Sequence, residues 1–184
     1  MCVTAPCWDR LYEVASSQDG YFTTAQAADV GYSPQLLVHY LRTNKLTRLQ
    51  RGIYRLVHFP PGEHEELTLA WLWSEQQGVI SHQTALSLLE LSDVLPSKVH
   101  VTLPLAWKTR RLRVPSGVEI HHGNVPKNER TWFGPVPITK ARRSLFDSAR
   151  EGLSPEFVKQ ATRQALKRGL VTKQELRGLG EVSP

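Results

Sequence analysis

The chain has 184 residues, of which 40% are hydrophobic, a length that allows one medium domain or a small domain beside a larger one. It shows no basic start followed by an apolar run and no stretch of about 18 apolar residues, so neither a signal peptide nor a membrane span is expected. Its two cysteines, Cys2 and Cys7, argue against a disulfide framework and against a zinc site, and we expect a cytoplasmic protein without metal or cofactor.

The net charge is +6, from 23 basic and 17 acidic residues, and its distribution is more informative than its size. No acidic residue lies between Asp29 and Glu63, and none lies between Asp93 and Glu119. Two separate basic blocks favour a nucleic-acid partner more than a uniform excess would.

The first 59 residues follow the element order of a winged helix-turn-helix domain. Helices are expected over residues 8–16, over residues 25–30 and from Ser33 to Arg42, with a short strand at Tyr21-Phe22. Thr23 or Thr24 is suited to cap the second helix, and Ser33 is suited to cap the third. Gly31 stands where a C-cap glycine belongs, and Pro34 lies in a first helical turn, where its missing N–H does no harm.

The third helix is amphipathic at about 100° per residue. The side expected to pack on the preceding helices carries Leu36, Leu37, Tyr40 and Leu41. The opposite side carries Gln35, Val38, His39 and Arg42. Because Gln and Arg pair bidentately with adenine and guanine, this side is predicted to read base edges in the major groove. The alternative interpretation is an ordinary solvated helix face.

A basic hairpin follows, with strands expected over residues 46–50 and 53–57 and a two-residue turn at Arg51-Gly52. Its arginines are expected to project as a wing, with Arg51 at the tip near phosphate or the minor groove. A hairpin kept soluble by its charges is the alternative. The predicted DNA-binding residues are Thr24, Ser33, Gln35, His39, Arg42, Thr43, Lys45, Arg48, Arg51 and Arg55.

The prolines at Phe59-Pro60-Pro61-Gly62 mark a boundary, because they interrupt both helix and central strand. We therefore expect an α+β protein, with a winged helix-turn-helix domain over residues 1–59 and a mixed α+β domain over residues 63–184. Helices are expected over residues 63–77, 82–91, 140–150 and 155–168 and from residue 172 onward, and strands over 99–103, 118–121 and 136–138.

No catalytic motif stands out, and an enzyme is not expected. His121 and His122 are adjacent on a predicted strand and point to opposite faces, which argues against a metal pair. Glu156 and Lys159 have the spacing of a helical surface pair, and Asp147 is positioned to bind Arg142 or Arg143.

A second basic block contains Lys98, Lys108, Arg110, Arg111 and Arg113, with Trp107 nearby. An arginine-rich loop with an aromatic residue can bind an RNA or DNA backbone. A solvated β-hairpin loop explains the same residues equally well.

Several segments resemble the AbiEi-type antitoxins of type IV toxin–antitoxin systems. The N-terminal segments that carry the resemblance are Gly20-Tyr-Phe-Thr-Thr-Ala-Gln-Ala27 and Arg48-Leu-Gln-Arg-Gly-Ile-Tyr-Arg55. It continues in Val79-Ile-Ser-His-Gln-Thr-Ala-Leu86, Val99-His-Val-Thr102 and Ile138-Thr-Lys-Ala-Arg-Arg-Ser-Leu-Phe-Asp147. The order of these short motifs is the stronger evidence.

The resemblance implies a transcriptional repressor that binds inverted repeats upstream of its own operon and counteracts a nucleotidyltransferase-like toxin through its C-terminal domain. Whether neutralisation needs direct contact with the toxin is left open. The resemblance is compatible with a monomer in solution and two copies on DNA. Two alternatives use residues 98–113 instead: a nucleic-acid-processing enzyme and an RNA-binding adaptor.

Overall fold

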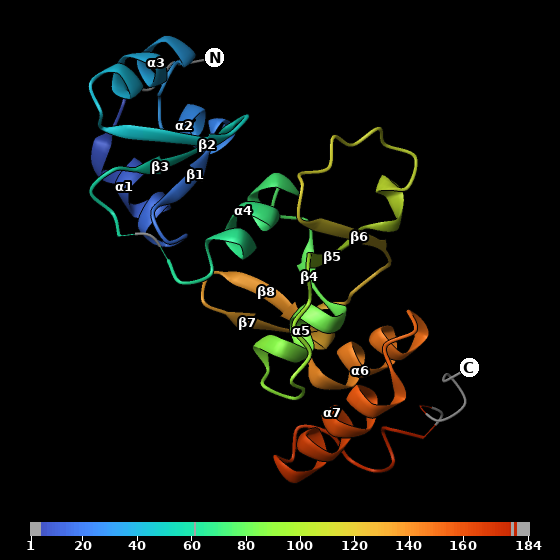
Figure 1. Cartoon of the computed structure of the whole chain (residues 1–184). Coiled ribbons are helices and arrows are strands. Elements are labelled where there is room, and N and C mark those ends of the chain that lie inside the picture. The colour runs from blue at the N-terminus through green and yellow to red at the C-terminus, as the bar shows by residue number, and fades with distance from the viewer. Residues whose placement is uncertain (1–4, 61, 178, 180–184) are drawn as a thin grey trace. The chain divides into compact units, whose positions relative to one another are not determined.

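The computed structural model describes residues 5–60, 62–177 and 179, and the chain divides into two compact units, Met1–Gln76 and Gln77–Pro184 (Figure 1). The mixed α+β class expected from the sequence is confirmed. Cys2 lies outside the described residues, and Cys7 is a half-buried free thiol.

The first unit contains a small antiparallel sheet of strand order β1-β3-β2, surrounded by helices (Figure 1). Its elements are α1 (Trp8–Ser16), β1 (Tyr21–Thr23), α2 (Thr24–Asp29), α3 (Pro34–Arg42), β2 (Leu46–Gln50), β3 (Ile53–Leu56) and α4 (Glu65–Trp73). Leu11, Phe22, Leu37 and Leu56 are among the buried side chains of its core. This order is consistent with a winged helix-turn-helix.

Local capping signals explain where α2 and α3 begin. Thr23 accepts a hydrogen bond from the Gln26 backbone N–H, and the Gln26 side chain accepts one from Thr23 N, which completes a capping box. Ser33 Oγ accepts from Leu36 N, and Pro34 occupies the first turn of α3. The predicted caps of both helices are thus confirmed, with α2 one residue earlier than expected.

The irregular alternation of the wing is produced by a β-bulge. Arg48 pairs with Tyr54 and Gln50 pairs with Ile53, so Leu49 is an extra residue in β2. The bulge lets both Leu46 and Leu49 turn inward although they are three residues apart: Leu46 is buried and Leu49 is half-buried.

Helix α4 belongs to the first unit, so the structure divides the chain after Gln76 and not at residues 59–63. Thr68 Oγ1 donates to Asp19 Oδ2 at 3.4 Å, and Gln76 Nε2 donates to Gln18 Oε1 at 2.8 Å. The prolines interrupt the backbone, but these side-chain contacts join α4 to the turn before β1. The assignment of functions to the two domains stays a prediction.

The second unit is built on a mixed sheet of order β6-β5-β4-β8-β7, in which β4/β8 and β5/β6 are parallel. Its strands are β4 (Val79–Ile80), β5 (Val99–Leu103), β6 (Val118–His122), β7 (Arg130–Phe133) and β8 (Val136–Thr139). Its helices are α5 (His82–Leu88), η1 (Leu105–Trp107), η2 (Lys127–Glu129), α6 (Ala141–Arg150) and α7 (Pro155–Lys167). Leu86, Leu145 and Ala161 belong to a buried core that joins α5, α6 and α7.

One expectation for this unit is wrong, and one of the alternatives is excluded. Residues 173–177 form turns where a terminal helix was expected, and residues 178 and 180–184 of that expected helix lie outside the described residues. Ser81 precedes α5 without a side-chain cap, and its hydroxyl lies 2.8 Å from His82 Nδ1. Residues 104–117 are not a hairpin loop, because β5 and β6 are parallel and a parallel pair needs a crossover connection.

Candidate nucleic-acid interface

The exposed face of α3 is the one predicted from the sequence. Its four residues, Gln35, Val38, His39 and Arg42, are all exposed, while Leu37 on the opposite side is 1% exposed. None of the four is needed to close the core. The helix therefore presents two donors or acceptors for base edges, Gln35 and Arg42, with Val38 and His39 between them.

Aromatic rings pack against the side of α3 that faces the rest of the first unit. The Tyr40 ring lies 5.9 Å from the Trp8 ring of α1 and 5.8 Å from the Tyr32 ring. Burial raises the pKa of Tyr32 to about 12, with a smaller contribution from neighbouring Tyr40. A helix packed in this way against two aromatic rings keeps its exposed side chains at constant positions, which sequence readout requires.

The wing tip is fixed by a glycine turn. Gly52 has a φ of +81°, and its carbonyl accepts hydrogen bonds from Thr24 N at 2.9 Å and Thr24 Oγ1 at 3.3 Å. The start of α2 therefore anchors the turn, and Arg51 remains exposed at the tip.

Four of the predicted basic residues are exposed: Arg42, Lys45, Arg48 and Arg51. Asn44, in the left-handed region at φ +53°, ends α3 and is followed by Lys45, whose ammonium lies 5.2 Å from the Tyr40 ring centre. Arg48 Nε donates to Gln50 O at 3.3 Å. These four cations occupy α3, the turn after it and the wing, which is the distribution that phosphate contacts on both sides of a groove require.

Three predicted residues use their hydroxyls inside the protein. Ser33 caps α3, Thr24 binds Gly52 O, and Thr43 Oγ1 donates to His39 O at 3.1 Å. Their structural roles account for these residue types without any DNA contact.

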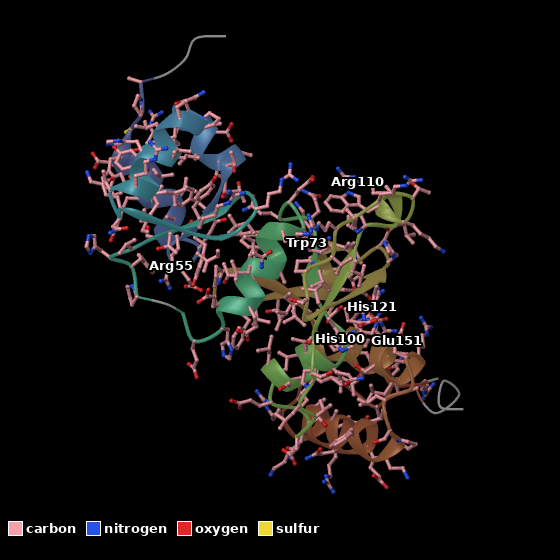
Figure 2. The ribbon with its side chains drawn as sticks, turned by 45° about the horizontal axis from the view of Figure 1, so that its top comes forward. Arg55, Trp73, His100, Arg110, His121 and Glu151 are labelled. Carbon is pink, nitrogen blue, oxygen red and sulfur yellow. The ribbon has the colours of Figure 1, made fainter. Side chains whose placement is uncertain are left out.

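Arg55 differs from the other arginines of the wing. Its strand, β3, is the central one, and its side chain is only 20% exposed. The guanidinium lies 4.0 Å from Glu65 of α4 and over the Tyr21 ring at 6.0 Å. Arg55 thus pairs within the first unit, where Figure 2 labels it.

The second basic block divides into two parts. Lys98, at the end before β5, forms a 2.8 Å ion pair with Glu119. Lys108, Arg110, Arg111 and Arg113 are exposed on the crossover after η1, and Arg110 stacks over the Trp107 ring at 4.0 Å. One face of Trp107 is therefore covered by an arginine of its own loop, which reduces the area left for stacking a base.

One cluster escaped prediction from the sequence. His121 points inward, as its alternation with exposed His122 implies, and it meets His82 and His100 from other elements. The sequence shows only the adjacent pair. Asp147 behaves as expected, since its Oδ2 accepts from Arg143 Nε at 2.6 Å.

Residues 9–57 match the model of a transcriptional regulator family, the AbiEi antitoxins. The resemblance stated from the sequence is confirmed for this segment, which runs from the second residue of α1 to the end of β3. A crystal structure of the RV2827C protein from Mycobacterium tuberculosis is similar with a TM-score of 0.50 at 18% identity, over 96% of this chain and 71% of that chain. At this identity the likeness concerns the fold alone.

No curated protein matches the chain. None of the helices in the described ranges combines the length and apolar character that a bilayer crossing needs.

Proposed function

We propose that this protein is a sequence-specific DNA-binding repressor that controls its own operon and acts as the antitoxin of a type IV system. The observation that carries the proposal is the exposed polar face of α3 beside an exposed basic wing, in a stretch without acidic residues. The regulator family matched by residues 9–57 supports it. On this account Gln35, His39 and Arg42 read bases, and Lys45, Arg48 and Arg51 hold phosphates.

Two copies bind an inverted repeat, each placing α3 in one half-site about one helical turn apart. A nucleotidyltransferase-like toxin is the partner of the second unit. The protein is a cytoplasmic binding protein and not an enzyme.

Fluorescence anisotropy with the DNA upstream of the gene and with a scrambled duplex, each across a salt series, tests the proposal. We expect the native duplex to bind at least 1,000-fold more tightly, in the range typical of specific sites. If both duplexes bind equally and with a steep salt dependence, the protein binds DNA by electrostatic attraction alone, and the sequence-specific proposal is wrong.

A further inference from the structure

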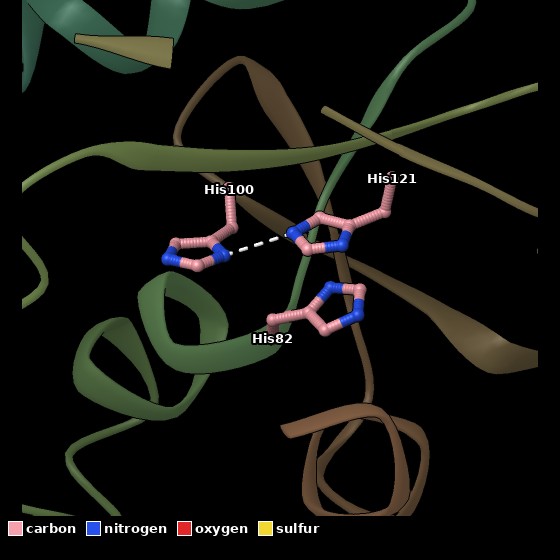
Figure 3. A group of neighbouring side chains, drawn as sticks. All are labelled: His82, His100 and His121. Carbon is pink, nitrogen blue, oxygen red and sulfur yellow. Dashed lines mark hydrogen bonds between the residues drawn. The ribbon is translucent and has the colours of Figure 1, made fainter. Parts of the chain in front are cut away.

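Three histidine side chains from separate elements of the second unit converge at one place (Figure 3). His82 begins α5, His100 lies on β5 and His121 on β6. One ring nitrogen from each lies within 4.8 Å of the others. His100 Nδ1 and His121 Nε2 are 2.9 Å apart, and the His82 ring stacks on the His121 ring at 3.6 Å.

Polar side chains around the cluster contact two of these rings. Ser81 Oγ lies 2.8 Å from His82 Nδ1 and itself accepts from Thr102 Oγ1 at 2.7 Å. Glu151 Oε1 lies 3.3 Å from His121 Nδ1, and Figure 2 labels both residues. The other ring nitrogen of His121, Nε2, is directed at His100 (Figure 3). A carboxylate on the far nitrogen of an imidazole is the usual support of a metal-ligating histidine.

We propose that His82, His100 and His121 bind one transition metal ion of the zinc class, each imidazole donating one nitrogen. Three nitrogen ligands without a carboxylate among them select zinc, nickel or copper over magnesium and calcium. Three protein ligands leave a fourth tetrahedral position for water or for an oxygen of a bound molecule. The site lies in the second unit and does not depend on the proposed DNA binding.

The environment favours the neutral, ligating form of two of the rings. Burial, with help from His121 and His100, lowers the pKa of His82 to about 3, and burial also lowers the pKa of His100. His82 is also held at φ +53°, a backbone conformation that costs a non-glycine residue energy and is concentrated at functional sites.

Binding requires small local rearrangements of the three rings. Two Zn–N bonds of about 2.05 Å at the tetrahedral angle place their nitrogens about 3.3 Å apart. The metal ion therefore replaces the hydrogen bond between His100 and His121, and the two nitrogens move apart by a few tenths of an ångström. The proton of that hydrogen bond moves to the other nitrogen of its own ring, so both imidazoles stay neutral. The nitrogen of His82, which lies within 4.8 Å of the other two, moves closer to them.

Calorimetric titration of the EDTA-treated full chain with zinc chloride tests the site, with magnesium chloride as the negative probe. We expect one zinc ion per chain and no heat from magnesium. Single variants His100→Ala and His121→Ala should weaken zinc binding at least 10-fold. His122→Ala, the exposed neighbour on the same strand, should bind as the wild type does. The proposal is overturned if the wild type binds no zinc. It is also overturned if His100→Ala binds zinc as tightly as the wild type.

A second measurement on the wild-type chain guards against variants that fail to fold. Long-range ¹H–¹⁵N NMR spectra record the ring nitrogens of each histidine during zinc titration. At one equivalent, the signals of His82, His100 and His121 should shift together while that of His122 stays unmoved. A shift of His122 or of other exposed histidines alone would assign zinc to the surface and contradict the site.

Discussion

Arg51 and Arg55 lie in the same hairpin, four residues apart, but their surroundings differ. Arg51 is exposed at the wing tip, whereas Arg55 lies between Tyr21 and Glu65. Side-chain identity alone therefore does not define the interface; the strand position and the neighbouring helix decide which cation is available to phosphate.

This difference predicts opposite phenotypes for two alanine variants. Arg51→Ala should weaken binding to any duplex and reduce the slope of log K against log salt by roughly 0.9, with stability unchanged. Arg55→Ala should lower the free energy of unfolding by about 1 kcal/mol, because packing of its stem and its partly screened ion pair are lost. Urea unfolding and anisotropy separate the two. An Arg55→Ala protein of wild-type stability that binds DNA as poorly as Arg51→Ala would place Arg55 in the interface.

Tyr32 provides a pH-dependent test of the packing behind α3. Its pKa is about 12 in the folded protein and about 10 in an unfolded chain, because burial disfavours the phenolate. Folding stability is therefore full below pH 10 and falls as pH rises from 10 to 12, by roughly 1 kcal/mol per pH unit. Tyr32→Phe should lose less stability over this interval than the wild type, in urea unfolding at each pH. Tyr12→Phe, at an exposed site on α1, is the control. Equal curves of stability against pH for the wild type and both variants would contradict the raised pKa of Tyr32.

At the scale of elements, two glycines hold the first unit in shape for different reasons. Gly20, with φ +86°, precedes β1, and a Cβ there would meet the Phe59 ring at 2.6 Å. Gly52 has a similar φ of +81°, but its nearest such contact is Thr24 Oγ1 at 3.5 Å. Substitutions at Gly20 and Gly52 therefore separate two costs in folding free energy. Backbone strain is present at both positions, whereas close steric overlap is present only at Gly20.

Gly52→Ala should cost about 1 kcal/mol of folding free energy, from the left-handed backbone alone. Gly20→Ala should cost about 1–3 kcal/mol more, because Phe59 must move from its place against the core. Thermal or urea unfolding of both variants provides the comparison. Equal losses would show that Phe59 yields freely and that the close contact is unimportant.

The elements that local signals define were predictable from the sequence. Ser33-Pro34 and Thr23 with Gln26 mark helix starts through bonds within one turn, and the amphipathic period gave the exposed face of α3. Local signals did not reveal that β5 and β6 pair in parallel, because that pairing depends on residues about 20 positions apart. The same limit hid the histidine cluster, whose members come from three elements.

The partial burial of Arg55 escaped prediction for a related reason, and its role in DNA binding stays a prediction. Strand alternation predicted its projection, but the side chain contacts Glu65 of α4, a helix that was expected to belong to the other domain. Strand β7 was missed because it is a short edge strand that begins with Arg130, and its pairing with β8 decides its conformation.

For the whole molecule, the two acid-free stretches lie in different units and have different character. In the first unit, exposed cations gather on α3 and the wing. In the second, Lys98 is neutralised by Glu119 and Arg110 is stacked on Trp107. We therefore expect the first unit to dominate DNA affinity, and the second to be the unit through which partner and metal binding act.

The most direct measurement of sequence readout compares the wild type, Arg51→Ala and the double variant Gln35→Ala/Arg42→Ala. Each is titrated with the native upstream duplex and a scrambled duplex at one fixed salt concentration. The double variant should lose 1–3 kcal/mol of discrimination, or about 5- to 150-fold in the affinity ratio, because its base contacts are removed. Arg51→Ala should weaken both duplexes equally and keep the ratio. An unchanged ratio in the double variant would contradict the assignment of α3 as the element that reads DNA sequence.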